Sequence, residues 1–180
     1  PGQAPRFVYV GRLSPEKGLD TLIAAFAGFR LASPQARLVI IGGGPLRQSL
    51  EQQALDLGLG DAVEFAGSMG QDALAEQYSN ATCLVLPSRS EPWGLVVNEA
   101  LHYGCPVVVS DNCGCVPELV INGITGYRFE TNNPDDLKDK LTRVVNELSD
   151  LKIGAANCLS HISQYTPKAA ALQMLDGCKK

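Results

Sequence analysis

The sequence lacks several features that mark particular classes of protein. No apolar run approaches the roughly 18–20 residues that a membrane-spanning helix requires. Lys and Arg number 15 against 19 Asp and Glu, and the net charge of −4 disfavours binding to nucleic acid, which depends on a basic surface. With 18 Gly and 11 Pro in 180 residues, the composition is not that of a low-complexity chain. What remains is a mildly acidic globular domain, which we expect to be cytoplasmic and not to insert into a membrane.

Candidate metal ligands and disulfides are also scarce. The two histidines, His102 and His161, stand far apart in the sequence. The six cysteines include the C-x-C pair Cys113 and Cys115, but no second pair and no histidine at a zinc-ligand spacing. A chain of this length needs no disulfide framework. We therefore expect reduced structural cysteines and no metal site, with metal or disulfide chemistry as the alternative.

The opening segment, residues 1–5, is polar and rich in turn-forming residues, and it leads directly into an apolar run. No apolar segment typical of a signal peptide precedes that run. We interpret residues 1–5 as an interdomain linker, residues 6–150 as the principal domain and residues 151–180 as one or two further helices. This interpretation implies an additional N-terminal lobe.

Short apolar runs alternate along the chain with amphipathic segments. The runs predict strands at residues 7–10, 38–41, 63–66, 83–86, 107–109 and 127–129. Apolar residues at helical spacing predict helices at residues 19–26, 46–57, 72–78, 95–103, 116–121 and 134–148. Apolar strands that are each followed by a helix indicate a parallel sheet covered on both faces. We therefore predict an α/β fold with a doubly wound, parallel, six-stranded, Rossmann-like sheet, whose ligand lies beyond the carboxyl ends of the strands.

The loop after the first predicted strand carries two cations, Arg12 and Lys17. Arginine offers a planar fork that matches a phosphate, and lysine adds a mobile point charge. Two cations at the carboxyl end of a strand predict an anion site. A pair of solvated loop charges would give the same pattern.

A glycine-rich loop, residues 42–45, follows the second predicted strand. A dinucleotide fingerprint would follow the first strand, and Arg47 stands where its third glycine should be. A nicotinamide-dependent oxidoreductase is therefore disfavoured. We interpret the loop as a tight turn that lets a ligand approach the backbone.

The loop after the fourth predicted strand contains Glu91 and Glu99, with a helix predicted to begin near Gly94 between them. The unpaired backbone N–H groups of residues 94–96 would form an anion site at the start of that helix. Glu91 would then reach one side of a bound phosphate, and Glu99 would accept hydrogen bonds from vicinal hydroxyls on the other. A turn glutamate and a surface glutamate would give the same spacing.

Taken together, these segments resemble the C-terminal, donor-binding domain of a retaining GT-B glycosyltransferase of family four, the glycosyl transferases group 1. The resemblance covers about residues 6–148. It rests on Gly11-Arg12-Leu13 with Lys17-Gly18, Val63-Glu64-Phe65-Ala66-Gly67, Leu86-Pro87-Ser88, the E-x7-E stretch Glu91–Glu99, Gly104-Cys105-Pro106-Val107-Val108, Pro117-Glu118 and Asn122-Gly123-Ile124-Thr125-Gly126. Trp93 replaces a phenylalanine that is frequent in the family. Cys115 replaces a frequent glycine, a change that would narrow the sugar subsite.

The resemblance implies a substrate, a nucleoside diphosphate sugar linked to UDP, GDP or ADP, and no metal or other cofactor. The implied binding residues are Gly11, Arg12, Lys17, Ser68, Met69, Glu91, Trp93, Gly94, Leu95, Val96 and Glu99. Glu91, Arg12 and Lys17 are implied to be catalytic: the two cations would hold the diphosphate, and Glu91 would stabilise charge developing at the anomeric carbon. Glu99 would bind the ribose hydroxyls, and Ser68 and Met69 would lie beside the base.

We therefore expect the donor-binding half of a hexosyltransferase. The acceptor, a sugar, a lipid or a small molecule, would be bound through the N-terminal lobe, toward which residues 151–180 would pack. That lobe could also hold the enzyme at a membrane surface. The isolated domain should bind nucleotide and transfer little sugar. A GT-B sugar-nucleotide epimerase and a non-catalytic nucleotide-binding module remain as alternatives.

Overall fold

The computed structural model describes residues 4–148 and 151–165. Its strands are β1 (Arg6–Val10), β2 (Arg37–Ile41), β3 (Val63–Gly67), β4 (Cys83–Leu86), β5 (Val107–Ser110) and β6 (Gly126–Phe129). Each of the six predicted strands is present, with both ends within one residue of the prediction. The central strands β4 and β5 are buried along their whole length, which explains why they are apolar throughout rather than alternating.

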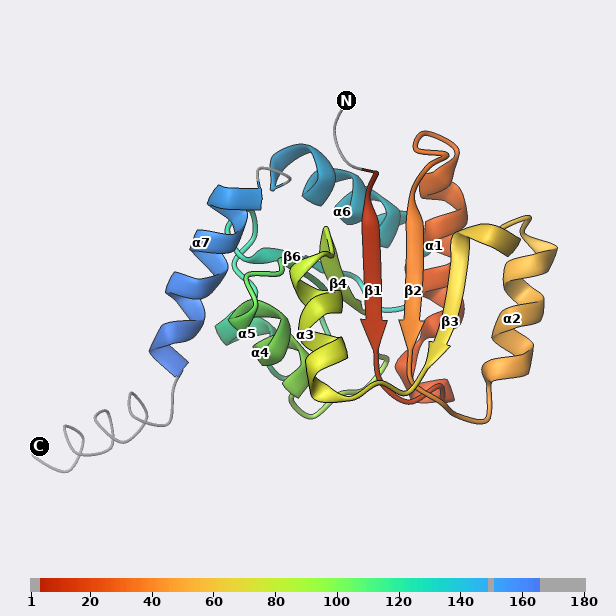
Figure 1. The fold of residues 1–180 in the computed structure, drawn as a ribbon, viewed down its shortest axis with the longest axis horizontal. Coiled ribbons are helices and arrows are strands. Elements are labelled where there is room, and N and C mark those ends of the chain that lie inside the picture. Colours follow the sequence, from red (N-terminus) through yellow and green to blue (C-terminus); the bar gives the residue numbers. More distant parts are fainter. Residues whose placement is uncertain (1–3, 149–150, 166–180) are drawn as a thin grey trace, which may run out of the picture.

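The strands form one parallel sheet in the order β3-β2-β1-β4-β5-β6 (Figure 1). The chain winds outward from β1 to β3, crosses back to β4 beside β1, and then winds in the opposite direction. The prediction of a doubly wound, Rossmann-like sheet is thereby confirmed. The strand order reverses between β1 and β4, so the carboxyl ends of these two strands form the switch point where such sheets bind ligands.

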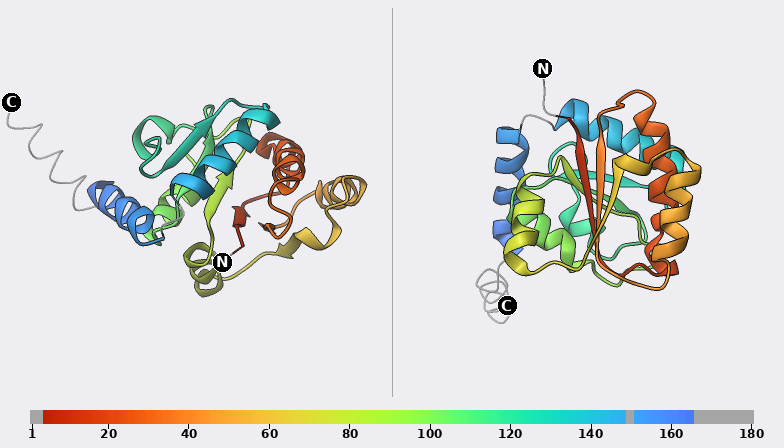
Figure 2. Two further views of the ribbon diagram at one scale, coloured as in Figure 1. Left: turned by 90° about the horizontal axis from the view of Figure 1, so that it is seen from above. Right: turned by 45° about the vertical axis from the view of Figure 1, so that its right-hand side comes forward.

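Helices cover both faces of the sheet (Figure 2). One face carries α1 (Leu19–Arg30), α2 (Arg47–Asp56) and α6 (Pro134–Glu147), and the other carries α3 (Gln71–Ser79), α4 (Leu95–His102) and α7 (Leu151–Ile162). The remaining helical elements are the short α5 (Val116–Leu119) and the 3-10 turns η1 (Pro15–Lys17), η2 (Gly60–Ala62) and η3 (Ser163–Tyr165). Against the first face, Phe7 of β1 packs edge-on to Phe29 of α1, with ring centroids 5.1 Å apart.

The segment from residue 151 packs on this domain through α7, which lies against α4. The contact is close, because a Cβ atom on Gly104 would lie 2.9 Å from the Cβ of Ala155. The Tyr165 hydroxyl also donates to the carbonyl of Glu118 at 3.1 Å. Residues 1–3 of the predicted linker, 149–150 at the end of the predicted domain and 166–180 of the predicted C-terminal segment lie outside the described residues. Packing of this segment toward a second lobe stays a prediction.

Among the described residues, no helix has the length and hydropathy to cross a bilayer.

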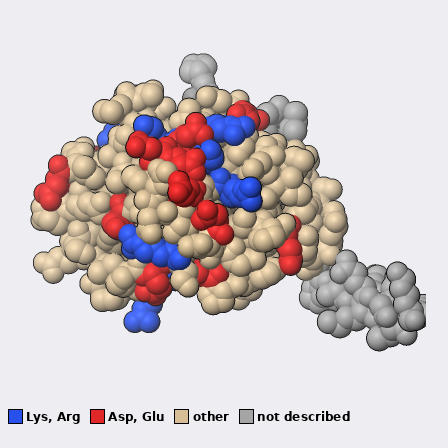
Figure 3. Space-filling model, turned by 180° about the vertical axis from the view of Figure 1, so that it is seen from behind, with Lys and Arg blue, Asp and Glu red and all other residues tan. Residues whose placement is uncertain are grey.

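Helix α6 begins with the favoured chemistry for a helix N-terminus. The side chain of Asn133 accepts a hydrogen bond from the backbone N–H of Asp136 at 3.0 Å, and Pro134 occupies the first helical position. Farther along, Lys140 pairs with Asp136 at 2.8 Å, and Arg143 pairs with Glu147 at 2.9 Å. On the face opposite that of Figure 1, acidic and basic side chains are interspersed rather than segregated (Figure 3).

The Asn133 cap gives a direct test of this local structure. Asn133→Ala should lower the free energy of unfolding by about 1 kcal/mol, because one N–H of the first turn loses its acceptor. Asn146→Ala is the matched control: it makes the same change at an exposed position inside the same helix, where alanine is the better helix former. Urea unfolding followed by circular dichroism measures both. Equal effects of the two substitutions would contradict the capping role.

Candidate functional site

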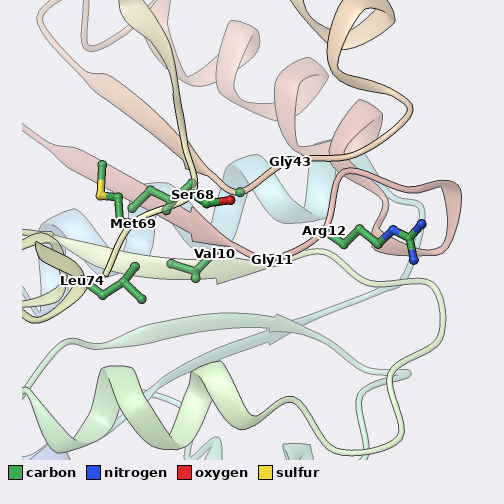
Figure 4. A pocket seen from close by; sticks show the side chains of 9 residues that line it. Val10, Gly11, Arg12, Gly43, Ser68, Met69 and Leu74 are labelled. Carbon is green, nitrogen blue, oxygen red and sulfur yellow. The ribbon is translucent and has the colours of Figure 1, made fainter. Parts of the chain in front are cut away.

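Two adjoining pockets lie at the switch point of the sheet. The first, of about 320 Å³, is lined by Val10, Gly11, Arg12, Ile41, Gly42, Gly43, Ser68, Met69 and Leu74 (Figure 4). The second, also about 320 Å³, is lined by Val10, Gly11, Lys17, Leu86, Glu91, Pro92, Trp93, Gly94, Leu95 and Val96. Val10 and Gly11 line both pockets, so the two form one crevice on either side of the end of β1. Of the candidate site residues, all except Glu99 line this crevice.

The loops after β1 and β2 are in direct backbone contact. The N–H of Leu13 donates to the carbonyl of Gly43 at 2.9 Å. A Cβ atom on Gly42 would lie 1.9 Å from the carbonyl oxygen of Gly11, and one on Gly44 would lie 2.4 Å from that of Leu13. These two glycines therefore permit contact between loops. Gly42 and Gly43 both line the first pocket, but only Gly43 has no atom within 4 Å of its added Cβ. Gly43 therefore fits the interpretation that the turn lets a ligand approach.

Lys17 and Glu91 form an ion pair in the second pocket. Lys17 Nζ lies 2.5 Å from Glu91 Oε2, and the side chains are 21% and 16% exposed. The motifs predict separate roles for these residues, and the structure joins them although they are 74 positions apart. The positive charge of Lys17 is thus already balanced by a carboxylate. Arg12 is exposed, and no ion pair of its guanidinium is found within residues 4–148 and 151–165. Figure 4 shows it extending away from Met69 and Leu74.

Arg89, for which the sequence predicts no role, holds the loop that carries Lys17. Its guanidinium donates to the carbonyl of Pro15 at 2.6 Å, to both carboxylate oxygens of Asp20 at 2.8 and 2.6 Å, and to Asn132 Oδ1 at 2.6 Å. Its backbone N–H donates to the carbonyl of Glu16 at 2.8 Å. Arg89 therefore fixes the turn η1, and with it the position from which Lys17 reaches the pocket. The one signal in the sequence is its place two residues before Glu91.

The loop after β5 supports the loop that carries Glu91. The N–H of Gly114 donates to the carbonyl of Glu91 at 2.9 Å, and that of Cys115 to the carbonyl of Trp93 at 3.1 Å. A Cβ atom on Gly114 would lie 2.0 Å from the carbonyl oxygen of Pro92. The structure shows that the loop packs against the backbone of the pocket wall.

Helix α4 begins at the wall of the second pocket. Gly94, its N-cap, has φ +93°, in the left-handed region that favours glycine, and the helix starts at Leu95 as the sequence predicts. The Trp93 indole N–H donates to Asn98 Oδ1 at 2.8 Å, which fixes the ring over the first turn. Because residues 94–96 line the pocket, the N-terminal end of the helix, with its partial positive charge, borders the space.

Glu99 lies one turn farther along α4 and accepts a hydrogen bond from the hydroxyl of Tyr78, at 3.0 Å from Oε2. Tyr78 is 1% exposed, whereas Glu99 is exposed to solvent. Burial, and secondarily the negative charge of Glu99, raises the pKa of Tyr78 above its ordinary value, so the phenol stays protonated and acts as a donor. No motif in the sequence points to Tyr78, whose partner is 21 positions away.

The cysteines of the described residues, Cys83, Cys105, Cys113, Cys115 and Cys158, are all buried free thiols. Burial raises the pKa of Cys113 to about 11 and that of Cys115 to about 12, which keeps both thiols protonated and unreactive near neutral pH. Cys178 lies outside the described residues. Within residues 4–148 and 151–165, no three His, Cys, Asp or Glu side chains are grouped to hold a metal ion.

Comparison with known proteins identifies the family. The family model described as glycosyl transferases group 1 matches residues 1–154. The chain belongs to this family. The resemblance drawn from the motifs is thereby confirmed, and the sheet described above is one lobe of the GT-B architecture.

Three relatives show how far the likeness of this group 1 glycosyl transferase chain extends. A GDP-mannose-dependent alpha-(1-6)-phosphatidylinositol monomannoside mannosyltransferase of Mycobacterium tuberculosis is 34% identical over 151 residues, 80% of this chain and 39% of that protein. The structure of sucrose-phosphate synthase from Thermosynechococcus elongatus has a TM-score of 0.83 at 31% identity, covering 99% of this chain and 46% of that one. Anabaena HepE, solved in complex with UDP and glucose, has a TM-score of 0.81 at 26% identity, covering 96% of this chain and 47% of that one. The chain spans less than half the length of these relatives.

Proposed function

We propose that this domain binds a nucleoside diphosphate sugar in the two-pocket crevice and forms the donor-binding half of a retaining hexosyltransferase. The observation that carries the proposal is the junction of the two pockets at Gly11, at the switch point of the sheet. A nucleotide sugar has a base at one end, with apolar faces and hydrogen-bonding edges. It has a sugar at the other end and two negative charges between them. The crevice offers two compartments and places the cationic loop between them. The relatives named for GDP-mannose dependence and solved with UDP and glucose support this class of donor.

Each end of the donor is assigned to one of the two pockets. The base lies in the first pocket, beside Ser68 and Met69, and the sugar lies in the second, beside Glu91 and Trp93. The diphosphate lies at their junction, near Arg12, Lys17 and the start of α4, where cations and the end of a helix both favour negative charge. These groups stabilise the leaving diphosphate as the sugar departs, and the Glu91 carboxylate stabilises positive charge at the anomeric carbon.

We assign the other functions of the enzyme to the segments on either side of the donor site and to a further lobe. Residues 1–5 serve as a linker, residues 6–150 bind the donor, and residues 151–180 pack toward a further lobe. That lobe binds the acceptor, a sugar, a lipid or a small molecule, and makes any contact of the enzyme with a membrane surface. The domain alone then binds nucleotide and transfers little or no sugar. Appreciable transfer to an acceptor by this chain alone would contradict the division.

Calorimetric titration of the chain with UDP, GDP, ADP and their sugars tests the donor site. We expect binding of at least one nucleotide, weakened about tenfold or more by Arg12→Ala and by Glu99→Ala, because each substitution removes a charged hydrogen-bonding group. Arg37→Ala and Glu64→Ala are the matched controls, since both side chains are exposed and neither lines the crevice.

Two results would overturn the proposal. One is binding no tighter than millimolar for every nucleotide and sugar nucleotide, and the other is binding that neither Arg12→Ala nor Glu99→Ala changes. Conversion of the donor sugar into its epimer without an acceptor would show the epimerase instead.

A further inference from the structure

A buried tyrosine and an exposed glutamate form a hydrogen bond between α3 and α4 beside the crevice. The Tyr78 hydroxyl lies 3.0 Å from Glu99 Oε2. The Tyr78 ring stacks on Tyr103, with ring centroids 5.9 Å apart and an angle of 15° between the planes. Because Tyr78 is 1% exposed and held by packing, its hydroxyl is a donor at a fixed point. Glu99, by contrast, is an exposed flexible side chain whose orientation depends on that donor.

The hydrogen bond lies one helical turn from each pocket. Leu74 lines the first pocket, and Tyr78 follows it at i+4 on α3. Leu95 lines the second pocket, and Glu99 follows it at i+4 on α4. The pair therefore lies behind the walls of both compartments, on the side of the crevice formed by α3 and α4. Glu99 thus lies one turn along the helix whose first residues, Leu95 and Val96, line the second pocket.

The remaining acceptor capacity of Glu99 matches a vicinal diol. A carboxylate has about four acceptor positions on its two oxygens. Tyr78 occupies one position on Oε2, and among residues 4–148 and 151–165 no hydrogen bond to Oε1 is found. Two neighbouring hydroxyl groups can each donate one hydrogen bond to a carboxylate held in this way. An exposed glutamate without such a partner would lose side-chain entropy on binding them.

We propose that Tyr78 is a positioning residue, which holds Glu99 in the orientation that accepts the ribose hydroxyls and so sets the preference for ribonucleotides. The inference rests on the proposed function, because it assigns Glu99 to the ribose of the bound nucleotide. Tyr78 touches Glu99 and not the ligand. Its removal should therefore act only on ligands that carry the hydroxyls.

Tyr78→Phe removes the hydroxyl and keeps the ring, and Tyr103→Phe is the matched control, because it makes the same change in the stacked partner. Each protein is titrated by calorimetry with UDP and with 2′,3′-dideoxy-UDP, or with the GDP or ADP pair if that base binds more tightly. We expect Tyr78→Phe to weaken UDP binding about fivefold, and dideoxy-UDP binding hardly at all. The ratio of the two affinities should fall in Tyr78→Phe and stay at the wild-type value in Tyr103→Phe.

A double substitution separates positioning from general loosening of the fold. In the Glu99→Ala background, Tyr78→Phe should have no further effect on UDP binding, because no carboxylate remains to be oriented. Thermal melting of each variant verifies that it is folded. An equal loss for UDP and dideoxy-UDP, a further loss in the Glu99→Ala background, or unchanged UDP binding would overturn the role of Tyr78. These outcomes leave the donor site intact, whereas a wild-type chain that binds no nucleotide would overturn the donor site and the role of Tyr78 together.

Discussion

Lys17→Ala should weaken nucleoside diphosphate binding about 100-fold, the largest effect we expect from any single substitution of a charged residue in this domain. Two losses combine in this variant. The ligand loses a cation at the diphosphate, and Glu91 loses the partner that lies 2.5 Å away. Because both side chains are mostly buried, the freed carboxylate is poorly screened and repels the incoming diphosphate.

A second substitution tests this explanation. Lys17→Ala combined with Glu91→Gln should regain part of the lost affinity, since the repelling charge is gone while the side-chain shape is kept. Lys138→Ala, which alters a 43% exposed lysine on α6, is the control and should leave binding unchanged. Calorimetric titration with the best-binding nucleoside diphosphate measures all three proteins. If the double variant binds no better than Lys17→Ala, the repulsion by Glu91 is refuted.

The sheet could be predicted from the sequence because its signals are local. Segments such as 83–86 and 107–109 are apolar throughout, and only strands buried on both faces have that pattern together with the intervening helices. The signal for the start of α4 is equally local, because Gly94 adopts a left-handed conformation that few other residues tolerate. The crevice followed from topology, since loops at the carboxyl ends of β1 and β4 must meet where the strand order reverses.

The contacts between distant side chains could not be predicted in the same way. The motifs identified Lys17 and Glu91 as site residues, but nothing in either loop indicates that the two charges pair across the pocket. Arg89 and Tyr78 stayed hidden because their partners lie on other elements. A tyrosine on an amphipathic helix predicts burial, and its hydroxyl finds a partner only once α3 and α4 are placed side by side. Such pairs are properties of the tertiary structure.

The glycines after β2 allow a second prediction of large effect, on stability. Gly42→Ala should lower the free energy of unfolding by about 3 kcal/mol, because its Cβ would lie 1.9 Å from the backbone carbonyl oxygen of Gly11 and its φ is +133°. The atoms that this Cβ would meet belong to the backbone of Gly11 and not to a flexible side chain. The loops after β1 and β2 must therefore move apart. Gly43→Ala is the matched control: its Cβ has no atom within 4 Å, and its φ is outside the left-handed region. It should change stability by no more than about 0.5 kcal/mol.

Urea unfolding followed by circular dichroism distinguishes the two glycine variants, and equal destabilisation would refute the contact between loops as the reason for Gly42. The two glycine variants should also alter the crevice in different ways. Gly43 lines the first pocket, so Gly43→Ala places a methyl group at the ligand wall of a stable protein. Gly42→Ala instead displaces Gly11, the residue at which the two pockets meet. At temperatures where both variants remain folded, Gly42→Ala should therefore weaken nucleotide binding through the shape of the crevice, although residue 42 adds no charge and removes no hydrogen-bonding side chain.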